Sequence, residues 1–219
     1  MKGFFITGTD TDCGKTEVAC ALIRQLRGAG HTVAPFKPVA AGAELVDGQW
    51  RNDDALRLIE AAGWAGDYHE VNPYCFEDPV SPHLAAAKVG QTVDLPEICE
   101  KAENLARRAN FVIVEGAGGW LVPLSKELDI ATLARALGLP VVLVVGLRLG
   151  CLNHARLSEQ VILASGLPLA GWVASRVDPQ MALAEQNLDT LRDKLGAPFL
   201  GVLDWQAQSL QGGDLSCLL

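Results

Sequence analysis

The chain has 219 residues, of which 49% are apolar and 20% charged, a composition typical of one globular domain and not of a disordered protein. The net charge of −8 argues against a general nucleic-acid or anionic-membrane surface, because such surfaces rely on clustered Lys and Arg. The six cysteines include no C-x-x-C pair and no zinc spacing, and no apolar run suits a signal peptide or a membrane span. We therefore expect reduced thiols and a cytoplasmic location.

Six short apolar runs predict buried strands, at residues 3–7, 33–36, 111–114, 141–145, 169–174 and 199–202. Apolar residues at helical spacing predict helices between most of them, at 18–26, 55–59, 95–108, 130–137, 153–164 and 181–195. Continuously apolar strands separated by helices indicate a parallel sheet covered on both faces, so the predicted fold is doubly wound α/β. We expect a single domain over 1–219, with residues 64–91 as an irregular loop excursion.

The first predicted strand leads into a glycine loop, Gly8-Thr9-Asp10-Thr11-Asp12-Cys13-Gly14-Lys15-Thr16. Such a loop turns backbone N–H groups toward phosphate, while Lys15 would reach the β and γ phosphates and Thr16 would ligate Mg²⁺. Five residues separate Gly8 from Gly14 instead of the usual four. The loop predicts a P-loop nucleotide site, and the competing interpretation is a glycine turn with a chance lysine.

Three further groups follow predicted strands or begin a predicted helix. Lys37 follows the second strand and precedes a proline, so its ammonium could point into the phosphate site; the alternative is a solvated lysine. Glu115 closes the strand that starts at Phe111, where a Walker-B carboxylate belongs. Asp53 and Asp54 open a helix, and either metal ligation or plain N-capping would explain them.

A fourth group of interest is the turn that runs from Gly146 to His154, between a predicted strand and a predicted helix. Free N–H groups at Cys151, Leu152 and Asn153 could hold a carboxylate in the way that the first loop holds phosphate. A single strand-to-helix turn of this kind is weak evidence by itself.

Four segments at these spacings together resemble the dethiobiotin synthetase family: G-T-D-T-x-x-G-K-T from Gly8, K-P-V-A from Lys37, E-G-A-G-G from Glu115, and V-G-x-x-x-G-C-L-N-H from Val145. The similarity runs through nearly the whole chain. It implies an ATP- and Mg²⁺-dependent cyclo-ligase that joins CO₂ to 7,8-diaminononanoate and closes a ureido ring, giving dethiobiotin, ADP and phosphate. It also implies a homodimer with the substrate at the subunit interface.

The resemblance also implies roles for individual residues. Those implied for catalysis are Lys37, Lys15 and Thr11, and those implied as metal ligands are Thr16, Asp54 and Glu115. Nucleotide binding is implied for Asp12, Cys13, Gly14, Lys15, Thr16, Glu17, Asp54, Glu115, Gly116, Ala117, Gly118, Ser175, Arg176 and Asp204. Substrate binding is implied for Thr11, Asp12, Lys37, Ala41, Gly150, Cys151, Leu152 and Asn153.

Four positions depart from the family pattern. Ala41 replaces a usual Ser, which predicts weaker substrate binding, and Asp12 replaces a frequent Glu. Ser175 stands where the base-reading Asn is common and Asp204 where Pro is frequent, which leaves the nucleobase preference open. The main competing hypothesis is a nucleotide-driven dimerisation switch of the partitioning type, although the loop lacks an extra lysine near its start. A small kinase or an amide ligase of another cofactor pathway is a third.

Overall fold

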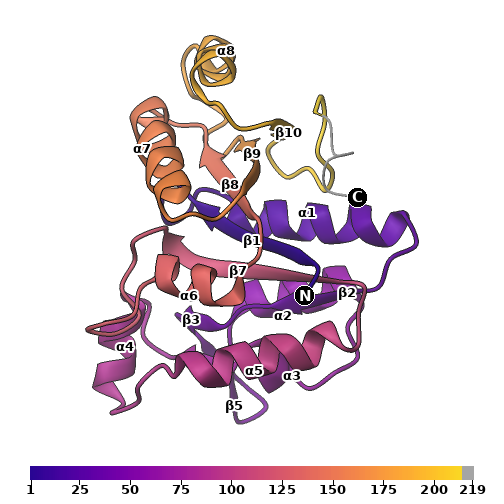
Figure 1. Ribbon diagram of the computed structural model, residues 1–219, viewed down its shortest axis with the longest axis vertical. Helices are drawn as coiled ribbons and strands as arrows, with labels where there is room; N and C mark the ends of the chain where they lie inside the picture. Colours follow the sequence, from indigo (N-terminus) through magenta and orange to yellow (C-terminus); the bar gives the residue numbers. More distant parts are fainter. Residues whose placement is uncertain (214–219) are drawn as a thin grey trace.

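The computed structural model describes residues 1–213, and its centre is a six-stranded sheet in the order β10-β9-β8-β1-β7-β2 (Figure 1). Every pairing in this sheet is parallel. The strands are β1 (Gly3–Gly8), β2 (Val33–Phe36), β7 (Phe111–Gly119), β8 (Val141–Gly146), β9 (Leu169–Ser175) and β10 (Phe199–Leu203). The predicted α/β fold is confirmed, and all six predicted strands are present.

Helices cover both faces of this sheet, which explains why its strands are continuously apolar. The long helices are α1 (Lys15–Gly28), α2 (Asp53–Ala62), α5 (Leu95–Ala106), α6 (Ile130–Leu137), α7 (Cys151–Ala164) and α8 (Ala184–Lys194). Along β1, Phe5 packs in the core beneath α5 to α8, whereas Phe4 and Ile6 pack in the core beneath α1 and α2. Successive strand residues therefore face two separate cores.

The prediction that residues 64–91 form an irregular loop is wrong. This segment holds α3 (Tyr68–Val71), β6 (Tyr74–Phe76) and α4 (Pro82–Lys88), and β6 pairs in parallel with another unpredicted strand, β3 (Val39–Ala41). An exposed hairpin of β4 (Glu44–Val46) and β5 (Gln49–Arg51) lies between β3 and α2. These elements are too short for a period to emerge from the sequence, and pairing between distant residues fixes them instead.

Asn72 and its neighbour Val71, in this same segment, hold the backbone carbonyl and N–H of Lys37. The Asn72 side chain is fully buried and donates to the carbonyl oxygens of Lys37 at 2.6 Å and Tyr74 at 3.2 Å. Its own oxygen accepts a hydrogen bond from the Tyr68 hydroxyl at 2.8 Å. The backbone N–H of Lys37 donates to the Val71 carbonyl at 2.9 Å. Lys37 is thus held by the segment that the sequence pattern did not resolve.

Strand β7 also differs from its prediction, because it continues past Glu115 to Gly119. Glu115 therefore lies within the strand and does not close it. The last residue of β7 pairs with Gly8, and a Cβ on Gly116 would lie 3.2 Å from the Phe5 ring. The glycines let β7 stay close to β1, but they carry no apolar side chain by which the strand could be recognised.

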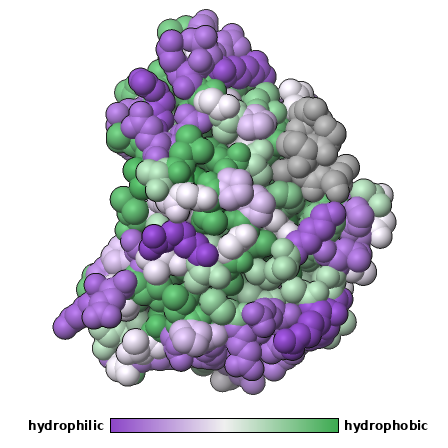
Figure 2. Space-filling model, in the orientation of Figure 1, coloured by the Kyte–Doolittle hydropathy of each residue, from purple (hydrophilic) through white to green (hydrophobic). Residues whose placement is uncertain are grey.

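One face of the molecule carries exposed apolar side chains around α7. Figure 2 shows hydrophilic residues over α8 and an apolar area across the middle of this face, where Figure 1 draws α6 and α7. On and before α7, Leu149 is 97% exposed, and Leu157 and Leu163 are more than half exposed. Within residues 1–213 no helix combines the length and apolar character that crossing a bilayer requires.

We predict that Asn72→Ala lowers the free energy of unfolding by roughly 2–4 kcal/mol, because it leaves two buried carbonyl groups without their hydrogen bonds. Asn104→Ala is the matched control, since Asn104 is exposed on α5 and its loss should change stability by less than about 0.5 kcal/mol. Urea unfolding of the two variants and the parent protein measures both values. Equal stability of all three proteins would contradict the assigned role of Asn72.

Candidate active site

A cleft of about 1110 Å³ opens at the carboxyl ends of the sheet strands. Loops and strand ends from distant parts of the sequence meet there, as expected for an open parallel sheet. Fifteen of the residues singled out from the sequence line it: Thr11, Asp12, Gly14, Lys15, Thr16, Glu17, Lys37, Ala41, Asp54, Glu115, Ala117, Gly118, Ser175, Arg176 and Asp204. These fifteen residues therefore share one cleft.

The glycine loop joins β1 to α1, and its shape depends on Gly14 at the helix N-cap. Gly14 has φ 87°, and a Cβ there would collide with the Ser175 hydroxyl, so only glycine fits. Lys15 follows as the first helical residue, and its ammonium donates to the Asp10 carbonyl at 2.9 Å across the loop. Free N–H groups of the first helical turn and this lysine form an arrangement suited to phosphate.

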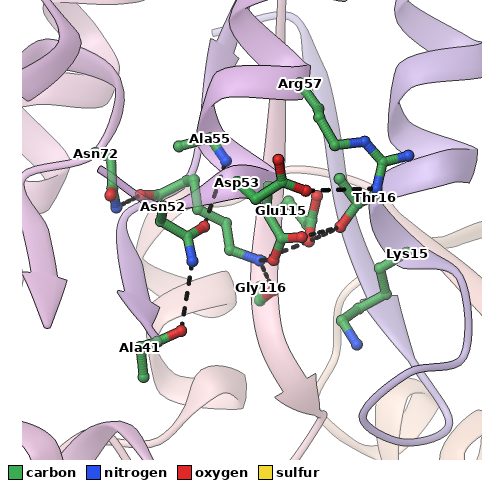
Figure 3. Close-up of polar contacts among 12 residues, drawn as sticks. Lys15, Thr16, Ala41, Asn52, Asp53, Ala55, Arg57, Asn72, Glu115 and Gly116 are labelled. Atoms are coloured by element: carbon green, nitrogen blue, oxygen red, sulfur yellow. Dashed lines mark hydrogen bonds and ion pairs between the residues drawn. The ribbon is translucent and has the colours of Figure 1, made fainter. Parts of the chain in front are cut away.

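The cleft contains an ion cluster around Lys37, and Figure 3 shows Thr16, Glu115 and Gly116 of this cluster. The Lys37 ammonium lies 2.6 Å from Glu115 Oε1 and 2.9 Å from Asp54 Oδ2, and 3.4 Å from the Gly116 carbonyl oxygen. Lys37 and Glu115 are buried, whereas the Asp54 side chain is 38% exposed. A cation from the end of β2 thus lies between carboxylates from α2 and β7.

The Thr16 hydroxyl places a further oxygen beside the two carboxylates. Its hydroxyl oxygen lies 2.9 Å from Asp54 Oδ1 and 2.9 Å from Glu115 Oε1, yet its single proton can be donated to only one of them. The second carboxyl oxygen of Glu115 is buried and has no hydrogen-bond partner among residues 1–213. Oxygens therefore exceed protons here, as they do where a hard cation such as Mg²⁺ binds.

This donor set favours Mg²⁺ over zinc. Among residues 1–213, no three His, Cys, Asp or Glu side chains come together as a metal site. A metal ion at this cluster would therefore have two carboxylates and one hydroxyl as its protein ligands. Two carboxylates and a hydroxyl suit Mg²⁺, which usually keeps several water ligands and is bound by one or two carboxylates together with phosphate oxygens.

Burial and charge pull the pKa values of this cluster in opposite directions. Burial alone would lower the pKa of Lys37, but Glu115 and Asp54 outweigh it and raise that pKa above its ordinary value. Burial would raise the pKa of Asp54, yet Lys37 and the Thr16 hydroxyl bring it below the usual value. For Glu115, burial prevails and raises the pKa, with Lys37 opposing it. The charge on Glu115 depends on an adjacent cation.

The first turn of α2 positions Asp54 for this cluster. Asn52 caps the helix by accepting the N–H three residues on at 3.4 Å, so N-capping does not account for the two aspartates. Asp53 points to solvent, with its side chain 82% exposed, and only Asp54 joins the cluster. An ion pair between Arg57 and Glu17, 2.9 Å long, links α2 to α1.

The other end of the cleft is formed by the ends of β9 and β10. Ser175 is buried there, and Arg176 donates from Nε to Asp204 Oδ1 at 2.8 Å. Arg176 also pairs with Glu185 on α8. Trp205 and the residues after it complete the wall. The two unusual residues at positions 175 and 204 therefore lie close together in the cleft.

Some predicted residues lie outside the cleft lining: Cys13, Gly116, Gly150, Cys151, Leu152 and Asn153. Cys13 belongs to the glycine loop but is fully buried, and Gly116 reaches the cluster only through its carbonyl oxygen. Residues 150–153 form the beginning of α7, with Gly150 as its N-cap at φ 98°. Within one chain, the structure does not bring this turn into the cleft.

Sequence reasoning missed Arg148 and Asp10. Arg148 Nη2 donates to Asp10 Oδ2 at 2.7 Å and to the Thr11 carbonyl at 3.2 Å, while Asp10 Oδ1 accepts the Thr11 N–H at 2.8 Å. These contacts tie the tip of the glycine loop to the turn before α7. An arginine two residues before Gly150 was the available signal, but nothing local pointed to its partner 138 residues away.

Sequence reasoning also missed Cys20, Arg24 and Arg57, which line the cleft beside Glu17. They lie at helical spacing on α1 and α2, and the sequence interpretation assigned them to no site.

Residues 2–211 match a family model described as an AAA domain. Similar solved structures include the cell division protein FtsY from Thermotoga maritima, with a TM-score of 0.57 and 15% identity, covering 99% of this chain and 66% of that chain. The chloroplast FtsY from Physcomitrella patens has a TM-score of 0.58 and 20% identity, with 99% and 63% covered. At these identities the likeness concerns the fold alone, and it agrees with a P-loop NTPase fold.

Closer relatives carry the name ATP-dependent dethiobiotin synthetase BioD. The protein from Aromatoleum aromaticum is 50% identical over 202 residues, 92% of this chain and 90% of that protein. The one from Xanthomonas oryzae pv. oryzae (strain PXO99A) is 49% identical over 216 residues, 95% and 96% of the two chains. The one from Pseudomonas paraeruginosa is 51% identical over 202 residues, 92% and 89%. The chain therefore belongs to the ATP-dependent dethiobiotin synthetases, a family of ligases.

Proposed function

We propose that this chain joins CO₂ to 7,8-diaminononanoate and closes the ureido ring of dethiobiotin, converting ATP to ADP and phosphate. The observation that carries the proposal is the contact between the phosphate loop and the ion cluster: Thr16 lies 2.9 Å from carboxyl oxygens of both Asp54 and Glu115, with Lys37 between the same carboxylates. A phosphate-binding loop and a second buried cation in one cleft suit the transfer of a phosphoryl group to an anionic acceptor.

The proposed chemistry proceeds in three steps. One substrate amine adds to CO₂ and loses a proton, giving a carbamate, which is a poor electrophile because it is an anion. A carbamate oxygen then attacks the γ-phosphorus of ATP, and ADP leaves. The second amine finally attacks the carbonyl carbon of the carbamic-phosphoric anhydride, which closes the ring as phosphate leaves and the amine loses its proton.

Three residues would support these steps by position and charge. Lys15 and Lys37 would neutralise the γ-phosphoryl group and the carbamate, which otherwise repel each other. Thr11, at the exposed tip of the loop, would contact the reacting amines. Asp12 would lie beside it, in a left-handed backbone conformation with φ 53°.

We assign Mg²⁺ to the oxygens of Thr16, Asp54 and Glu115, on the basis of their excess of acceptors over protons. When bound, Mg²⁺ would supply positive charge to the β and γ phosphate oxygens. Nucleotide contacts are proposed for the remaining cleft residues and their neighbours: Cys13, Gly14, Glu17, Gly116, Ala117, Gly118, Ser175, Arg176 and Asp204. Because Ser175 and Asp204 replace the residues that are common in the family, the preferred nucleobase stays open.

We further propose a homodimer in which the start of α7 binds the substrate carboxylate of the partner subunit. Gly150 has φ 98°, and the N–H groups of Cys151, Leu152 and Asn153 open the helix. The neighbouring Leu149 is 97% exposed, which suits a surface that a second copy covers. Ala41 lines the substrate end of the cleft without a hydroxyl. The cytoplasmic location and the single-domain organisation stay predictions.

Turnover of ATP should require both the diamine and bicarbonate, because the phosphoryl acceptor exists only after carbamate forms. Coupled ADP release, with each component omitted in turn, measures this requirement, and mass spectrometry identifies dethiobiotin in the complete mixture. Steady hydrolysis without the diamine, together with ATP-dependent dimerisation and no small-molecule product, would favour the switch hypothesis instead.

Asp54→Asn and Glu115→Gln should raise the Mg²⁺ concentration required for half-maximal turnover by roughly 10- to 100-fold, because each removes a charged oxygen ligand. Asp53→Asn is the matched control, since the Asp53 carboxylate is one residue away and exposed to solvent. Initial rates at fixed ATP across a Mg²⁺ series give these values. A similar Mg²⁺ requirement in Asp54→Asn and Asp53→Asn would refute the ligand assignment.

Arg148→Met should raise KM for the diamine by about 3- to 10-fold, because it frees the loop tip that carries Thr11 while leaving the phosphate-binding turn in place. KM for ATP should change by less than about twofold. Arg156→Met, which removes an exposed arginine from α7, serves as control. An equal rise in both KM values would show that Arg148 supports the whole loop and not its tip.

A further inference from the structure

Lys37 makes all the hydrogen bonds that an ammonium group can donate. Its three protons face Glu115 Oε1 at 2.6 Å, Asp54 Oδ2 at 2.9 Å and the Gly116 carbonyl at 3.4 Å. The residue is 3% exposed. In this arrangement the ammonium is fully engaged with protein oxygens, although the proposed chemistry requires it at the phosphoryl group and the carbamate.

The two carboxylates in turn depend on this cation. Glu115 is fully buried, and within residues 1–213 the ion pairs of Glu115 and Asp54 are both made by Lys37. Removal of one partner from a buried ion pair is strongly destabilising, because the remaining charge has neither water nor a counter-ion. Lys37 therefore holds Glu115 and Asp54 at the separation seen in the structure.

The same oxygen atoms are the proposed Mg²⁺ ligands. Glu115 Oε1 is shared between the Lys37 ammonium at 2.6 Å and Thr16 Oγ1 at 2.9 Å, and Asp54 contacts Lys37 through one oxygen and Thr16 through the other. A divalent cation among these oxygens would neutralise both carboxylates and repel a neighbouring ammonium group. The Lys37 ammonium and a metal ion therefore compete for the same carboxylate oxygens.

We propose that Lys37 is a positioning residue for Asp54 and Glu115 until Mg²⁺ binds, and that Mg²⁺ takes over these oxygens and releases the ammonium into the cleft. The lysine then reaches the transferring phosphoryl group only when the metal is in place. This inference rests on the metal site of the proposed function but not on the ligase reaction itself.

Competition of this kind has a measurable consequence. If Lys37 occupies the carboxylates in most molecules, only the remaining molecules can bind the metal. The apparent metal affinity is then the intrinsic affinity multiplied by the fraction of molecules whose carboxylates are free. An occupancy of nine molecules in ten gives about a tenfold weaker apparent affinity. Removal of the lysine should therefore tighten metal binding, while the metal-free protein loses stability.

The test compares Lys37→Met with Lys15→Met in the absence of nucleotide. The probe is MnCl₂ or MgCl₂ alone at constant ionic strength, with free Mn²⁺ counted by electron paramagnetic resonance and Mg²⁺ binding followed by calorimetry. Lys37→Met should bind both metals roughly tenfold more tightly than the parent protein. Lys15→Met removes the same charge from the same cleft, but Lys15 donates to a carbonyl and not to a carboxylate, so its gain should stay below about twofold.

Thermal unfolding gives a second readout that does not depend on activity. Without metal, Lys37→Met should melt on the order of 10 °C below the parent protein, and millimolar MgCl₂ should stabilise it more than the parent. If this variant cannot be purified, the comparison is made in the Asp54→Asn background, where adding Lys37→Met should still tighten metal binding to Glu115.

Equal or weaker metal affinity in Lys37→Met would overturn the inference, and so would an equal gain in Lys15→Met. Ligase turnover by the parent protein would in that case leave the proposed function standing. Conversely, tightened metal affinity without any dethiobiotin formed by the parent would contradict the proposed function and leave the inference intact.

Discussion

The burial of the Glu115 carboxylate, with Asp54 beside it, at the carboxyl end of the parallel sheet is the constraint on which the rest of the site depends. Glu115 is fully buried within β7, and Asp54 reaches the same point from the first turn of α2. Negative charge in such a place requires a cation within contact distance. Lys37 meets that requirement from the end of β2, so the stability of the fold and the chemistry of the cleft share one set of atoms.

The protein as a whole is acidic, with a net charge of −8, yet the family to which it belongs uses ATP. Local devices account for this combination. The glycine loop contains backbone N–H groups and Lys15, and the cluster contains Lys37. The residues that line the cleft balance in charge, with five acids (Asp12, Glu17, Asp54, Glu115 and Asp204) and five bases (Lys15, Arg24, Lys37, Arg57 and Arg176). A binding site for phosphate thus depends on the arrangement of a few groups and not on the overall charge.

The sequence contained most of the fold and many of the cleft residues. Continuous apolar strands and helix periods predicted the six-stranded sheet, because burial on both faces leaves a strong pattern. The apolar pattern did not predict strands that are very short or that contain glycine. Strands β3 and β6 have three residues each and pair with each other across a long stretch of sequence, and β7 continues through glycines. Arg148 was missed for the same reason, since its partner Asp10 lies on another strand's loop.

Asn72 gives the segment around α3 and β6 control over the backbone position of a cleft residue, Lys37. This segment holds the carbonyl and the N–H of Lys37. It is anchored in turn to distant residues, because the Tyr68 hydroxyl accepts the Asn52 N–H and the Tyr74 hydroxyl donates to Glu97. Any change that displaces these anchors would therefore reach the Lys37 backbone through Asn72. The position of the lysine depends in this way on residues such as Glu97, which do not line the cleft.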